Sequence, residues 1–190
     1  MRERTLAKHQ RIYVDLEYCY PGMNRESGRP DESALRQIVQ IAAIKTDTKT
    51  GKEIASLDIL VRPAFEKKLP PFFIELTGIT EQMVNDHGIA FSDAYTKFIR
   101  FCDIVPIWTF HNDWRVLKQN CGYFDIPLEL KPFTEVRGLL SGWGVDPTQY
   151  SSGTLHRAAE IEMHGHVHNA LYDVRSMAAA VHYFETHNQE

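Results

Sequence analysis

The chain has 190 residues, a length that suits one domain and is sufficient to bury a sizeable core. Hydrophobic residues make up 43% and charged residues 24% of the sequence, which excludes a disordered or fibrous protein. The formal net charge of −4 argues against a domain held on nucleic acid mainly by counterion release. It leaves open an enzyme that attracts phosphate through metal ions held by carboxylates.

The sequence also indicates where the protein works. The first residues contain no apolar segment typical of a signal peptide, and no run of about 18 apolar residues could span a bilayer. The three cysteines, Cys19, Cys102 and Cys121, form neither a C-x-x-C pair nor a disulfide framework. We therefore expect a cytoplasmic protein without membrane contact, in which the three thiols are buried.

The first third of the chain predicts strands. Short runs rich in β-branched and aromatic residues cover about 11–18, 38–44 and 53–61. A loop rich in Gly, Pro, Ser and Asn separates the first two, and the turn at 48–51 joins the second to the third. This pattern predicts an antiparallel meander.

Helical periodicity dominates the remainder, with one further strand predicted over Ile104 to Phe110. Helices are expected around Phe91 to Ile99, Asp113 to Cys121 and Leu155 to Ile161, and after Asn169, which is a suitable N-cap. No repeat or linker interrupts the pattern. We predict an α/β fold with a mixed central sheet flanked by helices, forming a single domain over 1–190 with its core at about 11–184.

Two acids stand together in the first predicted strand. Asp15 and Glu17 are two residues apart, so both carboxylates project from the same side of the sheet, about 7 Å apart at the backbone. Val14 and Leu16 point the other way. Taken alone, the pair also fits a half-buried strand that shows polar residues to water.

Asp113 follows the apolar strand that ends at Phe110, at the start of a predicted helix. In α/β proteins, sites are commonly built where a strand passes into a helix. Taken alone, Asp113 also fits an acid favoured in the first helical turn by the helix dipole.

His168 and Asp173 lie near the predicted last helix. Five residues place them about 140° apart around an ideal helix, so both cannot share one face. If Asn169 caps the helix, however, His168 belongs to the preceding loop and can reach a site that Asp173 helps to build. This arrangement suits a mobile base beside a fixed metal ligand.

Together these motifs resemble those of the DEDDh (DnaQ-like) 3′→5′ exonuclease superfamily. The resemblance rests on Asp15-Leu16-Glu17, Asp113, and the run from His168 to Asp173, in the family's order. The segment 75–80, with its L-T-G-I-T, is similar to one that such enzymes place after the meander. The match covers about 11 to 184 and is closest in style to Eri-like exonucleases and oligoribonucleases.

The sequence departs from the family pattern at two places. Tyr18 stands where many members have Thr, so a hydroxyl expected near the 3′ end is placed differently. The middle motif often reads H-N-x-x-F-D, whereas here His111-Asn112 is followed at once by Asp113. Asp113 is preferred because its D-x-x-x-L context resembles oligoribonucleases, and because it is the only acid between Asp103 and Asp125.

The resemblance implies a ribonuclease H-like fold and a metal-dependent hydrolase that acts from the 3′ end of single-stranded nucleic acid. Asp15, Glu17, Asp113 and Asp173 would bind two Mg²⁺ or Mn²⁺ ions, with His168 as the general base. RNA or short oligoribonucleotides are the expected substrate. A DNA-directed exonuclease and a non-catalytic adaptor are the alternatives.

Substrate contacts are predicted for Leu16, Tyr18, Thr77 and Gly78. The terminal base is expected to stack on an apolar wedge. The candidates for that wedge are Leu16, Tyr18, Met23, Phe110 and Trp114, each of which also fits a core position.

Three histidines alternate at positions 164, 166 and 168, a pattern that the family motif does not require. Imidazoles are good zinc ligands. The adjoining Met163 and Gly165 favour a surface loop over a zinc site.

Overall fold

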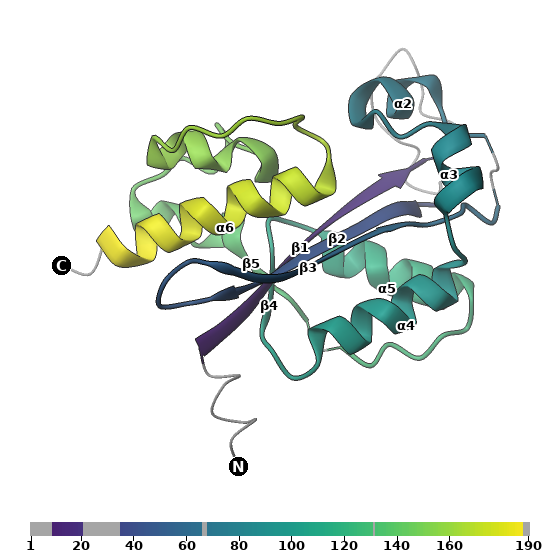
Figure 1. Cartoon of the computed structure of the whole chain (residues 1–190), viewed down its shortest axis with the longest axis horizontal. Coiled ribbons are helices and arrows are strands. Elements are labelled where there is room, and N and C mark those ends of the chain that lie inside the picture. The colour runs from purple at the N-terminus through teal and green to yellow at the C-terminus, as the bar shows by residue number, and fades with distance from the viewer. Residues whose placement is uncertain (1–8, 21–34, 66–67, 131, 188–190) are drawn as a thin grey trace.

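The computed structural model describes residues 9–20, 35–65, 68–130 and 132–187. A five-stranded sheet in the order β3-β2-β1-β4-β5 forms its centre, with helices on both faces (Figure 1). Strand β1 is antiparallel to β2 and parallel to β4. The mixed sheet predicted from the sequence is therefore confirmed.

The meander is made of β1 (Gln10–Cys19), β2 (Gln37–Asp47) and β3 (Glu53–Leu60). In the β2–β3 turn, the carboxylate of Asp47 accepts hydrogen bonds from the backbone N–H groups of Lys49 and Thr50, at 3.0 and 2.9 Å. Gly51 has φ of 68°, and a Cβ there would lie 2.4 Å from the ring of His182. Only glycine fits this close approach to α6.

The parallel part of the sheet is shorter than the sequence predicts. Strand β4 covers only Ile107–Thr109, and a two-residue β5 (Thr134–Glu135) pairs with it. Ile104 is 64% exposed and precedes the strand. The predicted start is wrong because Pro106 has no N–H to donate to a ladder, and its carbonyl accepts from Ile12 N just before β4 begins.

Within the described residues, eight helical segments surround the sheet. On one face lie α4 (Phe91–Cys102) and α5 (Asp113–Tyr123), and on the other α6 (Ala170–His187) (Figure 1). Beyond the end of β1 lie α2 (Pro71–Thr77) and α3 (Glu81–His87), which apolar spacing alone did not predict. The helix predicted at Leu155 to Ile161 is instead the 3-10 helix η4 (Ser152–Ala159), which ends where Glu160 turns left-handed.

Two short 3-10 helices, η2 (Val136–Gly138) and η3 (Leu140–Trp143), follow β5 and complete the layer beside α6. No helix in the described ranges has the length and apolar content to cross a membrane. The three cysteines are buried, as expected.

Alternation along β1 separates two apolar cores. Ile12, Val14 and Leu16 pack with α4 and α5, whereas Tyr13 packs with α6 and the 3-10 helices. Asp15 and Glu17 share the face of Tyr13 because side chains two apart point the same way. The alternation of side chains along β1 therefore buries the apolar residues in the core and places both acids on the face covered by α6.

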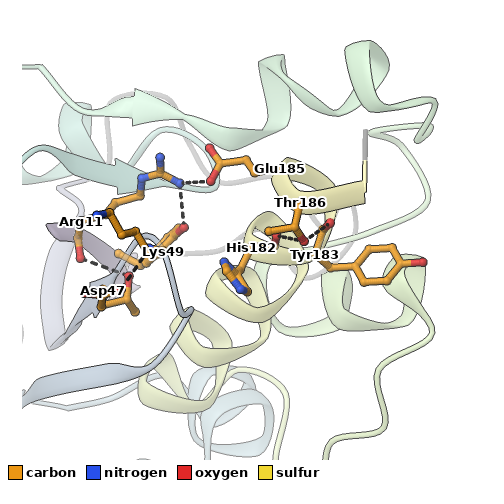
Figure 2. Close-up of polar contacts among 9 residues, drawn as sticks. Arg11, Asp47, Lys49, His182, Tyr183, Glu185 and Thr186 are labelled. Atoms are coloured by element: carbon orange, nitrogen blue, oxygen red, sulfur yellow. Dashed lines mark hydrogen bonds and ion pairs between the residues drawn. The ribbon is translucent and has the colours of Figure 1, made fainter. Parts of the chain in front are cut away.

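Arg11 links the start of β1 to the far end of α6. Its Nη1 donates to Glu185 Oε2 at 2.8 Å and to the hydroxyl of Tyr13 at 3.1 Å, and Figure 2 shows the guanidinium extended toward Glu185. The guanidinium also lies 3.7 Å from the ring centroid of Trp108 on β4. This contact fixes the C-terminal part of α6 against the sheet.

Asn120 joins α5 to the backbone that enters β2. Its Oδ1 accepts from Ile38 N at 3.1 Å, and its Nδ2 donates to the carbonyls of Arg36 and Val116 at 2.7 and 2.9 Å. The side chain is buried, so no solvent replaces these bonds.

We predict that Asn120→Ala lowers the free energy of unfolding by about 1–3 kcal/mol, because Ile38 N and two carbonyls lose buried partners. Urea denaturation measures this change. Gln119→Ala, at the adjacent exposed position of α5, is the matched control and should leave the midpoint nearly unchanged. Equal midpoints for the two variants would contradict the role of Asn120.

Candidate active site

A pocket of about 290 Å³ opens at the end of β1, between α2 and the turn that precedes α6. All five residues predicted as the catalytic set line it, although they come from three separate parts of the chain. They are Asp15, Glu17, Asp113, His168 and Asp173.

Strand β1 supplies the first two acids. Asp15 and Glu17 are 8% and 9% exposed, so their carboxylates lie in the pocket with little contact with bulk solvent. A register irregularity in the β1–β2 ladder falls directly after Glu17. Such irregularities re-aim side chains, and Tyr18 also lines the pocket here.

Asp113 reaches the pocket from the turn between β4 and α5. Asn112 adopts a left-handed conformation, with φ of 63°, and reverses the chain so that α5 begins at Asp113. The buried hydroxyl of Thr109 donates to the Asp113 carboxylate. The other acids considered for this motif, Asp103 and Asp125, do not line the pocket.

His168 lies in the turn before α6, as the sequence predicts, with φ of 70°. Its backbone N–H donates to both carboxylate oxygens of Asp173, at 3.2 and 3.3 Å. Asn169 Oδ1 accepts from Tyr172 N at 3.2 Å, which confirms it as the N-cap of α6. The cap thus separates a loop histidine from a helical acid and brings both to one place.

The other two histidines of the alternating run point elsewhere. His166 Nε2 lies 3.1 Å from the carbonyl oxygen of Leu76, which ties the loop to α2. His164 is exposed beside Glu162. Within the described residues, the group spaced to hold a metal is Glu17, His168 and Asp173, whose ligand atoms lie within 4.8 Å of one another.

Burial and mutual repulsion keep protons on this cluster. Burial raises the pKa of Glu17 to about 10, with further increases from Asp15, Asp173 and Asp113. Burial and Asp15 raise the pKa of Asp173 to about 8, against hydrogen bonds from His168 N and Ser152. Burial raises the pKa of Asp15 to about 6. Burial also raises the pKa of Asp113, and the nearby carboxylate of Asp15 raises it further. Four ionised carboxylates here require a cation.

The donor set fits a hard divalent cation. Carboxylate oxygens favour Mg²⁺ or Mn²⁺ over zinc, and four of them line one pocket. His168 adds an imidazole, whose pKa is lowered by burial and by the nearby His166. An uncharged imidazole beside a metal site can accept a proton from water.

The structure adds two residues that the sequence did not predict. Ser152 lines the pocket at the start of η4, and its hydroxyl donates to Asp173 Oδ2 at 3.3 Å. A Cβ on Gly153 would lie 2.3 Å from Asp173 Oδ1, so glycine allows the carboxylate to approach the backbone. The polar run at 151–154 signals a helix start, but nothing in it indicates that Ser152 has a partner 21 residues away.

An apolar wall faces the acids. Phe72 of α2 is 53% exposed on the pocket, and further wall residues come from β1, α2 and the end of β4. They include Leu16, Tyr18, Tyr20, Pro70, Phe73, Leu76 and Phe110. Leu16 and Phe73 are buried, at 4% and 5% exposed, whereas the exposed ring of Phe72 suits the face of a nucleobase.

The predicted substrate contacts divide into two groups. Leu16 and Tyr18 line the pocket, whereas Thr77 and Gly78 line a neighbouring one with Gln40 and Asp58. The Thr77 hydroxyl donates to the Phe73 carbonyl at 2.8 Å, and the left-handed Gly78 ends α2.

Of the wedge candidates, Phe110 lines the pocket as well. Trp114 packs in the core, with its ring centroid 5.2 Å from that of Phe133. Met23 lies outside the described residues.

Comparison with known proteins places this site in context. The family model Exonuclease (RNase_T) matches residues 23–181. No curated protein matches the chain. The nuclease domain of 3′hExo, a DEDDh family member bound to rAMP, is similar in structure with a TM-score of 0.81 and 19% identity, over 94% of this chain and 92% of that one.

Two other nucleases share the fold. Cell-death related nuclease 4 (CRN-4) gives a TM-score of 0.76 at 14% identity, over 94% of this chain and 64% of that one. The E. coli ExoI–ssDNA complex gives 0.68 at 20% identity, with 94% and 41% coverage, so this chain spans less than half of that protein.

The family match begins at residue 23, after the first acidic pair, and the structure brings that pair to the same pocket as the acids inside the matched range. The predicted ribonuclease H-like fold is confirmed by these neighbours. The chain belongs to the Exonuclease (RNase_T) family, and its fold is similar to that of 3′hExo, a DEDDh family member.

Proposed function

We propose that this protein removes nucleotides from the 3′ end of single-stranded nucleic acid, preferring RNA or short oligoribonucleotides, and releases nucleoside 5′-monophosphates. The observation that carries the proposal is the convergence of four acids and a loop histidine in one pocket with an apolar wall. We also propose a cytoplasmic location, because a reducing compartment suits the three buried cysteines.

Each part of the pocket has a separate task. Phe72 and Leu76 offer apolar surface on which a terminal base can stack, a contact worth roughly 1–3 kcal/mol for any base. This sequence-independent contact supports removal of nucleotides one after another. It also directs the terminal phosphodiester toward the acids on the opposite side.

Asp15, Glu17, Asp113 and Asp173 are proposed to hold two Mg²⁺ or Mn²⁺ ions. Such ions would activate the attacking water and stabilise charge on the phosphate oxygens. The hydroxyls of Thr109 and Ser152 orient two of the carboxylates through the hydrogen bonds described above.

His168 is proposed to accept the proton of the attacking water at its ring nitrogen. Its lowered pKa leaves the imidazole uncharged near neutral pH, which a base requires. The left-handed turn lets the ring lie over the acids while its backbone N–H stays bonded to Asp173.

The preference for RNA rests on motif style and on the neighbours. The L-T-G-I-T segment and the D-x-x-x-L context of Asp113 are similar to Eri-like enzymes and oligoribonucleases. Among the similar structures, 3′hExo is bound to rAMP, a 3′-exonuclease recognises a histone mRNA stem-loop, and E. coli ExoI is bound to ssDNA.

The function can be tested with labelled strands of one sequence. Three carry a 5′ label: RNA and DNA ending in a 3′-hydroxyl, and RNA ending in a 3′-phosphate. The fourth is circular RNA with an internal label. We expect stepwise shortening of linear RNA with Mg²⁺, slower shortening of DNA, and little action on the blocked or circular strands. EDTA should stop all cleavage. Activity in EDTA would contradict the proposed dependence on metal ions. Cleavage of the circular RNA would indicate an endonuclease. Faster cleavage of DNA than of RNA would show that DNA is the preferred substrate.

The raised pKa values predict how stability depends on pH without metal. For each acid the pKa in the folded protein exceeds the value of about 4 in the unfolded chain. The folded protein therefore holds the proton more tightly, and this contribution to stability is complete below about pH 4. The effect is lost as the pH rises through about 6, 8 and 10, the pKa values of Asp15, Asp173 and Glu17. In EDTA, the urea midpoint should therefore fall over this range.

Adding Mg²⁺ should restore the midpoint at high pH, because the cation binds only the folded site. Glu17→Gln removes a carboxyl whose pKa is raised to about 10 and should flatten the fall in EDTA. A metal-free midpoint that rises over this range would contradict the prediction.

Asp113→Asn tests the least conventional member of the set. We expect kcat to fall by more than about 100-fold, since even partners outside the metal-ligand shell contribute 10–100-fold. The amide keeps a hydrogen bond with Thr109, so the fold should persist by circular dichroism. Asp125→Asn is the matched control, because φ of 52° at that position tolerates asparagine. Loss of activity in the control instead would move the middle motif to Asp125.

A further inference from the structure

Gln40 is a buried polar residue in the middle of β2, only 3% exposed, on the sheet face that α6 covers. In the register of the sheet it lies opposite Glu17 of β1 and Leu60 of β3. It does not line the pocket of the acids. A buried amide is costly unless it is bonded, so its partners indicate why it is there.

Both ends of the Gln40 amide are bonded. Its Nε2 donates to Asp58 Oδ1 at 2.8 Å, and its Oε1 accepts from the backbone N–H of Ala170 at 3.3 Å. A carboxylate can only accept, so Asp58 turns the amide nitrogen toward β3. The amide oxygen is thereby directed to α6.

Ala170 is the first residue of α6, and its N–H has no partner within the helix. Asn169 caps the neighbouring N–H of Tyr172 from within the chain, and Gln40 caps Ala170 from the sheet. His168 lies two residues before Ala170, and Asp173 three residues after it. The Gln40 bond therefore fixes the junction between the turn that carries His168 and the helix that carries Asp173.

We propose that Gln40, oriented by Asp58, is a positioning residue that holds the start of α6 so that His168 and Asp173 meet Glu17. This inference rests on the proposed exonuclease function. Glu17 and Gln40 are paired across adjacent strands, so the bond to Ala170 sets the start of α6 relative to Glu17 itself. The ligand atoms of Glu17, His168 and Asp173 lie within 4.8 Å of one another, a spacing that a shift of α6 would open.

Gln40→Met removes both hydrogen bonds while keeping the length of the side chain. We expect the single-turnover rate on linear RNA with Mg²⁺ to fall about 10–100-fold, because a misplacement of about 1 Å can cost 100-fold. Affinity for RNA should stay close to that of the wild type, since the apolar wall is untouched. Rates are compared at a temperature where circular dichroism shows every variant folded.

Exchanging the amide of Gln40 and the carboxylate of Asp58 distinguishes a positioning role from a simple loss of stability. At mildly alkaline pH, Gln40→Glu alone sets two carboxylates against each other and should be slow. Adding Asp58→Asn returns a donor to face the new carboxylate, which still accepts from Ala170. The double variant should therefore regain most of the lost rate. Ser56→Asn, two residues along β3 at an exposed position, is the control for an amide on this strand and should not alter the rate.

The outcomes are distinct. A wild-type protein that degrades no nucleic acid overturns the proposed function, and the positioning role with it. An active wild type with an equally active Gln40→Met variant overturns the positioning role alone. A double variant no faster than Gln40→Glu also overturns it, whereas recovery of the rate supports it.

Discussion

Electrostatic repulsion among the four acids is the constraint on which this structure depends. The carboxylates would separate if they were free, and burial makes their ionisation costlier still, as the raised pKa values of Glu17 and Asp173 show. Their proximity must therefore be imposed by the scaffold. Two apolar cores, one on each face of the sheet, supply the necessary free energy.

The scaffold positions the four acids through three kinds of local structure. Strand alternation sets Asp15 and Glu17, a left-handed Asn112 sets Asp113, and an N-capped helix sets Asp173. The hydroxyls of Thr109 and Ser152 then bond to individual carboxylates. The helix that carries Asp173 is itself held at both ends, by Gln40 near its start and by Arg11 near its end (Figure 2).

Local patterns were sufficient to predict the meander, the first pair of acids and the capped last helix, because strand alternation and helix capping depend on residues close together in the sequence. They failed where the cause lies far along the chain. The start of β4 depends on the hydrogen bond from Ile12 N to the Pro106 carbonyl, which leaves Ile104 outside the strand. The role of Ser152 depends on its hydrogen bond to Asp173 of α6. Likewise, α2 is too short for its periodicity to be recognised, so Phe72 was not predicted to face the pocket. The pocket joins these predicted residues to ones that no local pattern reveals.

The site takes its acids from opposite ends of the sequence: Asp15 is in the first strand and Asp173 is in the last helix. On the ribosome, β1 leaves the exit tunnel long before α6 is made. A nascent chain that has not reached Asp173 therefore holds Asp15, Glu17 and Asp113 without the fourth acid, and the pocket is completed only after α6 is made. A chain that ends before His168 lacks both His168 and Asp173, so two of the five side chains predicted as the catalytic set are missing from the pocket.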